Sequence, residues 1–199
     1  MSAPSINLHA FLPRSRANGP GWRSVLWFQG CTLGCPGCFN PETHAPEPRQ
    51  WVSPADLVAR CLAVRGTEGV TISGGEPLQQ ARGLSDFLQL LRTQSRLSVV
   101  LFSGYTRSEI ESLPWGYEVL GRVDLLIAGR YDRTQACDDA LRASRNQETH
   151  FLTSRYAAAD LDRPLAEVIL HSDGRVIVTG FPTHPACRSR RGAEQRDPG

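Results

Sequence analysis

Short apolar runs alternate with amphipathic segments along most of the chain. Continuous apolar runs are typical of strands covered on both faces, and apolar residues recurring every three or four positions are typical of helices packed on a sheet. This pattern predicts strands at residues 5–12, 25–29, 69–73, 97–102 and 123–128, and helices at residues 54–65, 79–95 and 107–113. Because strand and helix alternate three times, we expect a parallel sheet with right-handed crossovers.

Two helix starts carry capping-box patterns, which are Ser53 with Asp56 and Thr106 with Glu109. In each pair, a hydroxyl side chain caps the helix and a carboxylate stands three residues later. The helix predicted at 79–95 has one strongly apolar face, which consists of Leu84, Leu88 and Leu91. We predict this face to be core rather than functional surface.

The pattern loosens after residue 131. Residues 132–150 are mostly charged and polar, and a short strand is predicted at 150–153. Further on, two β-rich runs at 166–171 and 175–179 flank the turn sequence Ser-Asp-Gly, which predicts a β-hairpin. We expect this hairpin to complete the fold.

The chain has 199 residues, enough for one domain with a sizeable core. We therefore expect a single α/β domain over residues 1–187, with a mostly parallel sheet and a C-terminal hairpin. The segment at 188–199 is rich in arginine, glycine and proline and is predicted to be a disordered tail. The proline-rich link at 41–48 favours an ordered, extended cover over a helix.

Charge and hydropathy exclude several classes of partner. The formal net charge is only +2, so net charge gives no reason to expect nucleic acid or membrane binding. No stretch is apolar over the length of a bilayer, and the N-terminus lacks the pattern of a secretory leader, so we expect a cytoplasmic protein. All 22 basic residues are arginine, which removes lysine from the candidate mechanisms.

Three cysteines, Cys31, Cys35 and Cys38, lie within eight residues directly after a predicted strand. The reducing cytosol disfavours disulfides, and clustered thiolates are ligands for zinc or for iron–sulfur clusters. A tetrahedral zinc ion or a complete four-iron cluster usually takes four protein ligands, so three thiols leave one coordination position open. If His44 fills it, the motif is a structural Cys3His zinc site; otherwise it is a four-iron cluster with one iron free for a small molecule.

The other three cysteines are isolated in the sequence. Cys61 falls in an apolar helix pattern and is expected to be a small buried hydrophobic residue. Cys137 and Cys187 have no neighbouring cysteines and therefore do not indicate a second cluster.

A second motif, Gly74-Gly75-Glu76-Pro77, follows the strand at 69–73. Two glycines let the backbone approach a ligand closely, and the carboxylate that follows can receive a cationic amine. Both motifs follow strands, and the carboxyl ends of parallel strands meet at one edge of a sheet. We therefore expect the cysteine loop and this turn to form one site.

With these motifs the chain resembles the radical S-adenosylmethionine superfamily, and more closely the activating enzymes of anaerobic ribonucleotide reductase and pyruvate formate-lyase. The resemblance spans roughly residues 5–153 and includes the segments 18–23, 28–31, 37–41, 103–106, 123–131 and 145–147. It differs at two places: Gly37 stands where the superfamily usually has an aromatic residue, and residues 143–147 read Ala-Ser-Arg-Asn-Gln instead of a Gly-Ser-Ser-Asn-Gln-like segment.

The resemblance implies a partial (β/α) barrel and a set of site residues. Cys31, Cys35 and Cys38 would hold a [4Fe-4S] cluster whose open iron chelates S-adenosylmethionine. The cofactor-binding residues it implies are Gly37, Cys38 and Phe39 on the adenine side and Gly74, Gly75 and Glu76 at the amino group. Reductive cleavage would give a 5′-deoxyadenosyl radical, with flavodoxin or ferredoxin as the electron donor and a glycyl radical protein as partner.

Two other functions stay open at this point. The chain could be a radical enzyme that acts directly on a small molecule or peptide, which the residues after Thr153 favour, or a non-enzymatic zinc module. The weaker site candidates each have a structural alternative: an ion pair for Asp124, a solvated rim for Arg23, Arg130 and Tyr131, and a turn cap for Asn146 and Gln147.

Overall fold

The computed structural model describes residues 5–139, 141–161, 166–170, 173–174 and 176–180. The tail expected at 188–199 and the end of the expected domain at 181–187 lie outside these residues. None of the helices in the described part has the length and apolarity needed to span a bilayer.

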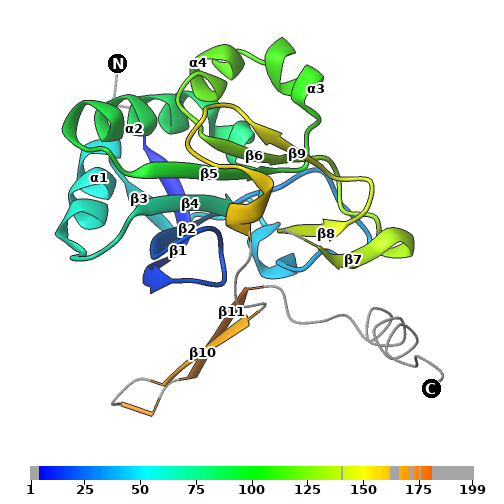
Figure 1. Cartoon of the computed structure of the whole chain (residues 1–199), viewed down its shortest axis with the longest axis horizontal. Coiled ribbons are helices and arrows are strands. Elements are labelled where there is room, and N and C mark those ends of the chain that lie inside the picture. Colours follow the sequence, from blue (N-terminus) through cyan, green and yellow to red (C-terminus); the bar gives the residue numbers. More distant parts are fainter. Residues whose placement is uncertain (1–4, 140, 162–165, 171–172, 175, 181–199) are drawn as a thin grey trace.

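Seven strands form the central sheet, in the order β3-β1-β2-β4-β5-β6-β9 (Figure 1). The four middle strands are parallel to one another, whereas β1, β3 and β9 pair antiparallel at the two sides. The strands are β1 Ile6–Ser15, β2 Arg23–Phe28, β3 Gln50–Val52, β4 Gly69–Gly74, β5 Ser98–Ser103, β6 Leu125–Ala128 and β9 Glu148–Phe151. The expected α/β fold with a largely parallel sheet is confirmed.

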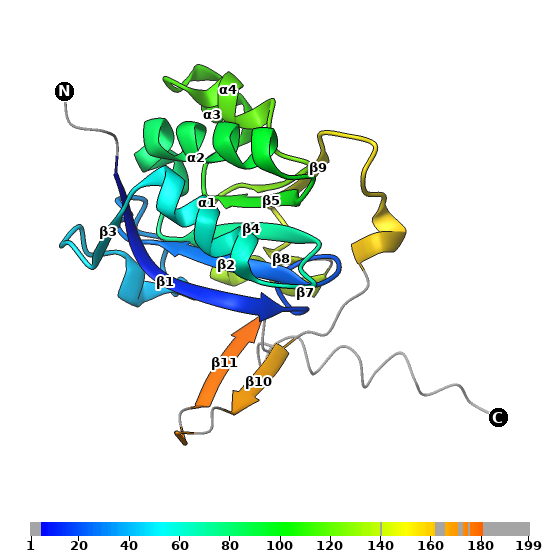
Figure 2. The same cartoon turned by 90° about the vertical axis from the view of Figure 1, so that its left-hand side faces the viewer.

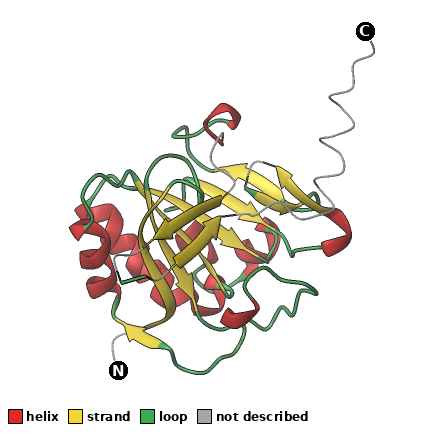
Figure 3. Cartoon of the chain, turned by 90° about the horizontal axis from the view of Figure 1, so that it is seen from below, coloured by secondary structure: helices red, strands yellow, loops and turns green. Residues whose placement is uncertain are grey.

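The α-helices gather on one side of the sheet, where α1 and α2 lie over its strands (Figures 2 and 3). They are α1 Pro54–Ala63, α2 Ala81–Gln94, α3 Arg107–Ser112 and α4 Gly116–Leu120. Four short 3-10 helices lie in the connections: η1 Pro41–Thr43, η2 Pro77–Gln80, η3 Arg133–Gln135 and η4 Ala158–Leu161. The link at 41–48 is therefore helical over its first turn, because Pro41 fixes a helical φ at the first position.

Side chains that alternate along the strands divide the interior into two clusters. Leu84, Leu88 and Leu91 on α2 are fully buried against the helix-side face of the sheet, as the spacing predicted. Cys61 is also fully buried there, and burial raises the pKa of its thiol to about 12, as expected for a buried hydrophobic residue. A smaller cluster on the other face includes Val100, Leu125, Ile127, Leu141 and Leu161.

Both predicted helix starts are confirmed. The hydroxyl of Ser53 accepts a hydrogen bond from the N–H of Asp56 at 3.1 Å. Thr106 and Glu109 form a reciprocal capping box, in which the Glu109 carboxylate accepts from the N–H of Thr106 at 2.7 Å. The first strand, however, continues to Ser15, beyond residue 12, where we expected it to end.

In the described part of the chain, two small hairpins lie apart from the central sheet. The hairpin of β10 Ala166–Leu170 and β11 Val176–Gly180 matches the predicted one. The hairpin of β7 Ala136–Asp139 and β8 Arg142–Ser144 was not predicted, because its sequence has no apolar alternation. The strand expected at 150–153 is β9, which starts two residues earlier.

We expected Arg23 to lie in a solvated rim, but the structure shows otherwise. It does not face the ligand side either. Its side chain is fully buried at the start of β2, at the edge of the sheet opposite to the cysteine loop. The guanidinium donates to neutral acceptors, including the hydroxyls of Thr71 at 2.8 Å and Ser98 at 2.9 Å and the carbonyl of Val70 at 2.7 Å. Because the guanidinium is removed from water, its pKa is lowered. Its hydrogen bonds to residues of β4 and β5 link the amino ends of the middle strands.

Asp124 also has a structural role. Its carboxylate forms an ion pair with Arg92 at 2.7 Å and accepts from the N–H of Val99 at 2.8 Å and the hydroxyl of Thr153 at 2.9 Å. Burial alone would raise its pKa, but these donors hold the pKa below its usual value. Of the two roles considered for Asp124, the structure supports the ion pair.

Candidate functional site

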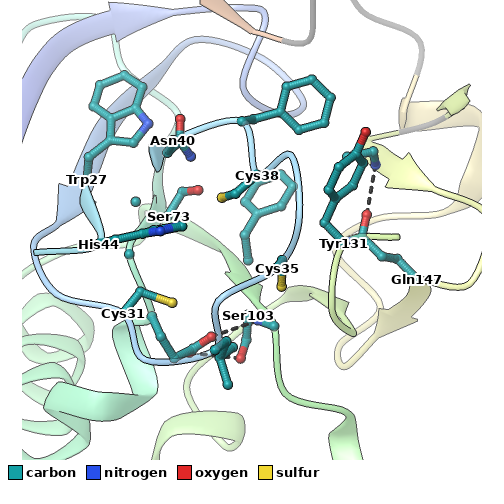
Figure 4. Close-up of a pocket in the computed structure, with 18 of the residues that line it drawn as sticks. Trp27, Cys31, Cys35, Cys38, Asn40, His44, Ser73, Ser103, Tyr131 and Gln147 are labelled. Atoms are coloured by element: carbon teal, nitrogen blue, oxygen red, sulfur yellow. Dashed lines mark hydrogen bonds between the residues drawn. The ribbon is translucent and has the colours of Figure 1, made fainter. Parts of the chain in front are cut away.

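One pocket opens at the carboxyl edge of the parallel strands, where the loops after β2, β4, β5 and β6 meet (Figure 4). In parallel sheets this edge is the usual place for ligands. Its lining brings together the sequence motifs, with Cys31, Cys35, Cys38, Phe39, Gly74, Gly75, Glu76, Ser103, Gly104, Gly129, Tyr131 and Gln147 among its residues.

The three cysteines stand around this pocket with free, half-buried thiols (Figure 4). Burial raises the pKa of Cys31 and Cys38 above the ordinary thiol value, so binding a metal group here would release protons. Gly34 and Gly37 adopt positive φ angles of 62° and 73°, which let the loop turn back on itself between the cysteines. Within the loop, the N–H of Cys38 donates to the carbonyl of Cys35 at 3.2 Å.

Backbone hydrogen bonds join the cysteine loop to its neighbours. The N–H groups of Gly30 and Cys31 donate to the carbonyls of Thr43 at 2.7 Å and His44 at 3.0 Å. The N–H of Glu76 donates in turn to the carbonyl of Gly30 at 2.9 Å. The start of the cysteine loop is thus held between the η1 turn and the glycine turn.

The glycine turn fits against the end of β2 with no room for side chains. A Cβ on Gly74 would lie 2.3 Å from the backbone nitrogen of Phe28, and a Cβ on Gly75 would lie 2.2 Å from the carbonyl oxygen of Gly30. Gly74 also has a φ of 107°, which only glycine adopts without strain. Two glycines are needed here for close packing of backbone on backbone, and this packing sets Glu76 at the pocket.

Glu76 is almost fully buried, and both of its carboxylate oxygens accept hydrogen bonds. One oxygen accepts from the N–H of Leu78 at 2.9 Å and the hydroxyl of Ser103 at 2.9 Å, and the other accepts from the N–H of Gly104 at 2.7 Å. Burial raises its pKa to about 7 despite these donors. A cation bound in the pocket would stabilise the ionised form.

The far wall of the pocket is aromatic. Phe39 and Tyr131 make an edge-to-face pair with ring centroids 5.0 Å apart, and Trp27 and Phe102 lie on the sheet floor. Ser73 and Asn40 add polar groups between them (Figure 4). A flat heteroaromatic ligand fits such a wall.

His44 lies in the pocket beside Cys31 (Figure 4). Among the described residues, however, no three His, Cys, Asp or Glu side chains converge closely enough to bind one metal ion. A tetrahedral zinc site needs all its donors about 2.0–2.3 Å from one centre, whereas a four-iron cluster takes each thiolate on a different iron. The arrangement therefore gives no support to the Cys3His alternative.

The model of one protein family, described as a 4Fe-4S single cluster domain, matches residues 17–150. This match covers both motifs and the whole pocket lining.

The chain belongs to this family, which is of the radical S-adenosylmethionine type.

Curated relatives of this single cluster domain protein are activating proteins. The anaerobic ribonucleoside-triphosphate reductase-activating protein of Vibrio cholerae is 32% identical over 74% of this chain and 99% of its own length. The corresponding protein of Enterobacteria phage T4 is 29% identical over 71% of this chain and 92% of its own. The pyruvate formate-lyase-activating enzyme of Clostridium pasteurianum is 32% identical over 60% of this chain and 50% of its own. The resemblance stated from the sequence is confirmed.

Several residues that the sequence suggested for the site lie outside the pocket or hold the loops that form its walls. Gly37 is not a lining residue, and the Arg133 side chain lies against it. Arg130 is at the rim, where it forms an ion pair with Glu109 at 2.9 Å. The Gln147 amide donates to the carbonyl of Gly129 at 2.9 Å, and the Asn146 amide donates to the carbonyl of Arg130 at 2.8 Å, so both hold the loop after β6.

Sequence reasoning missed the hydrogen bonds of Gln80 and the position of Ser73 and Phe102 in the pocket lining. The Gln80 amide accepts from the N–H of Asn7 at 2.7 Å and donates to the carbonyl of Gln29 at 2.9 Å, which joins β1, the end of β2 and the glycine turn. The alternation of strand residues could have placed Ser73 and Phe102 on the pocket side, because their neighbours Ile72 and Leu101 are core. No local pattern signals the Gln80 bonds.

Replacing Gly75 with alanine should destabilise the protein by about 3 kcal/mol, because the new Cβ would overlap the carbonyl of Gly30. Gly34→Ala is the matched control, since its Cβ would meet nothing within 4 Å and carries only the cost of a left-handed backbone, about 1 kcal/mol. Urea unfolding of both variants measures the difference. Equal losses would show that the close packing at Gly75 is unimportant.

Proposed function

We propose that this chain is a radical S-adenosylmethionine enzyme that generates a glycyl radical on a partner protein. The observation that carries the proposal is the meeting of three free thiols and a buried Gly-Gly-Glu turn in one pocket. The chemistry of this donor set fits an iron–sulfur cluster, and the carboxylate fits a cationic amino acid.

Cys31, Cys35 and Cys38 are the proposed ligands of the [4Fe-4S] cluster. When bound, the cluster and S-adenosylmethionine supply one-electron cleavage of a C–S bond and a 5′-deoxyadenosyl radical that abstracts hydrogen. The protein's own part is to hold the three thiolates in a loop that is fixed by its backbone bonds to Thr43, His44 and Glu76.

Glu76 is the proposed partner of the methionine amino group. An ammonium group needs acceptors, and the carboxylate of Glu76 is the anionic acceptor that this turn presents in the pocket lining. Its burial strengthens an ion pair, because the surrounding dielectric is low.

Phe39 and Tyr131 are the proposed adenine-side contacts. Their edge-to-face pairing leaves an aromatic surface toward the pocket, and Trp27 and Phe102 make the floor apolar. An apolar wall excludes water from a reactive radical. We further propose that a cytoplasmic flavodoxin or ferredoxin supplies the electron.

The test is to mix the anaerobically reconstituted protein, S-adenosylmethionine and dithionite with the anaerobic ribonucleotide reductase of the source organism. We expect about four irons per chain, 5′-deoxyadenosine, and an EPR signal of a glycyl radical on the reductase. 5′-Deoxyadenosine without that signal would contradict this partner and favour the alternative, a radical enzyme for a small molecule or peptide. Stoichiometric zinc without sulfide would contradict both enzymes.

A further inference from the structure

The β10–β11 hairpin has two unlike faces. Its register pairs Val168 with Val178 and Leu170 with Val176. These four side chains share one face, because alternate residues of a strand point the same way, and they are 58–75% exposed. We call this surface the aliphatic face; it contains no charged residue.

The opposite face is hydrogen-bonded to the end of β1 and to the loop that follows it. The carboxylate of Glu167 accepts hydrogen bonds from the hydroxyl of Ser15 and from the N–H of Arg16 at 2.9 Å. The hydroxyl of Thr179, which is almost fully buried, accepts from the amide of Asn18 at 2.9 Å. Asn18 itself lines the pocket, so the hairpin is held in place directly beside the site.

From this base the hairpin projects away from the sheet and its helices, and in two views nothing of the described chain covers its outer part (Figures 1 and 2). A two-stranded hairpin has little stability of its own, and a contiguous exposed aliphatic surface is typical of an interaction site. The aliphatic face thus has the composition of an interface.

The size of the aliphatic face argues against a second copy of this chain as its occupant. Only four side chains of two five-residue strands form this face, whereas each partner of a stable interface contributes about 20–30 residues. Two such faces packed together would therefore make only a weak contact. An occupant needs further contacts, and the pocket lies close to the base of the hairpin, because Asn18 lines the pocket and also bonds Thr179 on the opposite face.

The hairpin also lies outside the part of the chain that the family model matches. It lies beyond residues 17–150, and the Vibrio cholerae protein aligns over 99% of its own length to only 74% of this chain. An added surface beside a shared site suits recognition of one particular partner better than a common reaction step.

We propose that the aliphatic face docks an apolar segment of the protein that receives the radical, while the neighbouring chain of that protein reaches the pocket. This inference rests on the proposed function and names the surface that recognises the partner. It assigns to Val168, Leu170, Val176 and Val178 the role of contact residues, with no part in cofactor binding.

The first test is the double variant Val168→Ser/Val178→Ser with the reductase used above. We expect at least about a tenfold rise in the reductase concentration that gives half-maximal glycyl radical, because two apolar contacts are lost. 5′-Deoxyadenosine formation without reductase should equal that of the wild type, and circular dichroism melting reports folding. Unchanged concentration dependence would overturn the docking proposal and leave the proposed function standing.

The second test places the photo-crosslinking residue p-benzoylphenylalanine at Val178, with Tyr117 on α4 as the control position, since both side chains are more than 60% exposed. We expect the reductase to cross-link at Val178 and not at Tyr117. Cross-linking of two copies of this chain, with a dimer mass by light scattering, would overturn the proposal in favour of self-association. If the wild type forms no glycyl radical at all while cleaving S-adenosylmethionine, the proposed function fails instead.

Discussion

Replacing Cys35 with alanine should abolish assembly of the iron–sulfur cluster and, with it, cleavage of S-adenosylmethionine. Among the described residues, Cys35 is one of three cysteines that line the pocket, so its loss leaves two of these thiols to hold a cluster. Iron and acid-labile sulfide should fall from about four of each per chain to a small fraction after anaerobic reconstitution. No 5′-deoxyadenosine should form with dithionite.

Cys137→Ala is the matched control for this experiment. Cys137 is also a free, half-buried cysteine, but it lies on β7 and does not line the pocket. Its variant should retain full iron, sulfide and cleavage. If Cys35→Ala retained them as well, or if both variants lost them equally, the assignment of the cluster to the cysteine loop would be wrong.

The sequence predicted the middle of the fold well because the signals there are local. The strand before the cysteine loop contains a continuous apolar run, and the strand before the glycine turn is a short β-rich run. The caps at Ser53 and Thr106 are satisfied by residues three positions away. Helix α2 follows from its leucine face alone. Each of these features depends on a few neighbouring residues.

The sequence failed where distant residues decide the outcome. Arg23 looked like a surface residue by type, yet Thr71, Ser98 and the carbonyl of Val70 supply the acceptors that allow its burial. These partners come from β4 and β5, and only the sheet register brings them together. The β7–β8 hairpin likewise has no periodic pattern and is placed by its neighbours.

The pocket could be predicted from the sequence only in part. Its cysteines and glycines were found because their spacing is unusual, and the rule that ligands bind at the carboxyl edge of parallel strands placed them together. The bonds that set their geometry, such as those of Gln80 to Asn7 and Gln29, span up to 73 positions in sequence. A motif therefore indicates the ligand class, whereas the fold determines how rigidly the site is held.

Glu76 gives the second large expected effect, on S-adenosylmethionine affinity and on its pH dependence. Its pKa is raised to about 7 by burial, so the carboxyl group is mostly protonated below that pH in the free protein. A bound ammonium group requires the ionised form. Affinity should therefore rise as the pH increases to about 7 and level off above it, which isothermal titration of the reconstituted protein measures.

Glu76→Gln should weaken binding by about ten- to a hundredfold above pH 7 and remove this pH dependence, because a charged hydrogen bond contributes about 1.5–3 kcal/mol. The cluster should remain. Glu109→Gln is the control: the pKa of Glu109 is lowered to about 2 by Arg130 and Thr106, so its carboxylate does not titrate in this range. Unchanged affinity in Glu76→Gln would argue against the amine contact.

The same carboxyl group should make the stability of the free protein depend on pH. In the unfolded chain Glu76 ionises near pH 4.5, whereas in the folded protein it holds its proton to about pH 7. Between these values the folded state binds more protons, so the free energy of unfolding should decrease as the pH rises, by about 3 kcal/mol in total. Glu76→Gln should show a flatter profile, and S-adenosylmethionine should restore stability most strongly above pH 7. Such a result would mean that the free site stores an electrostatic cost that its cationic ligand removes.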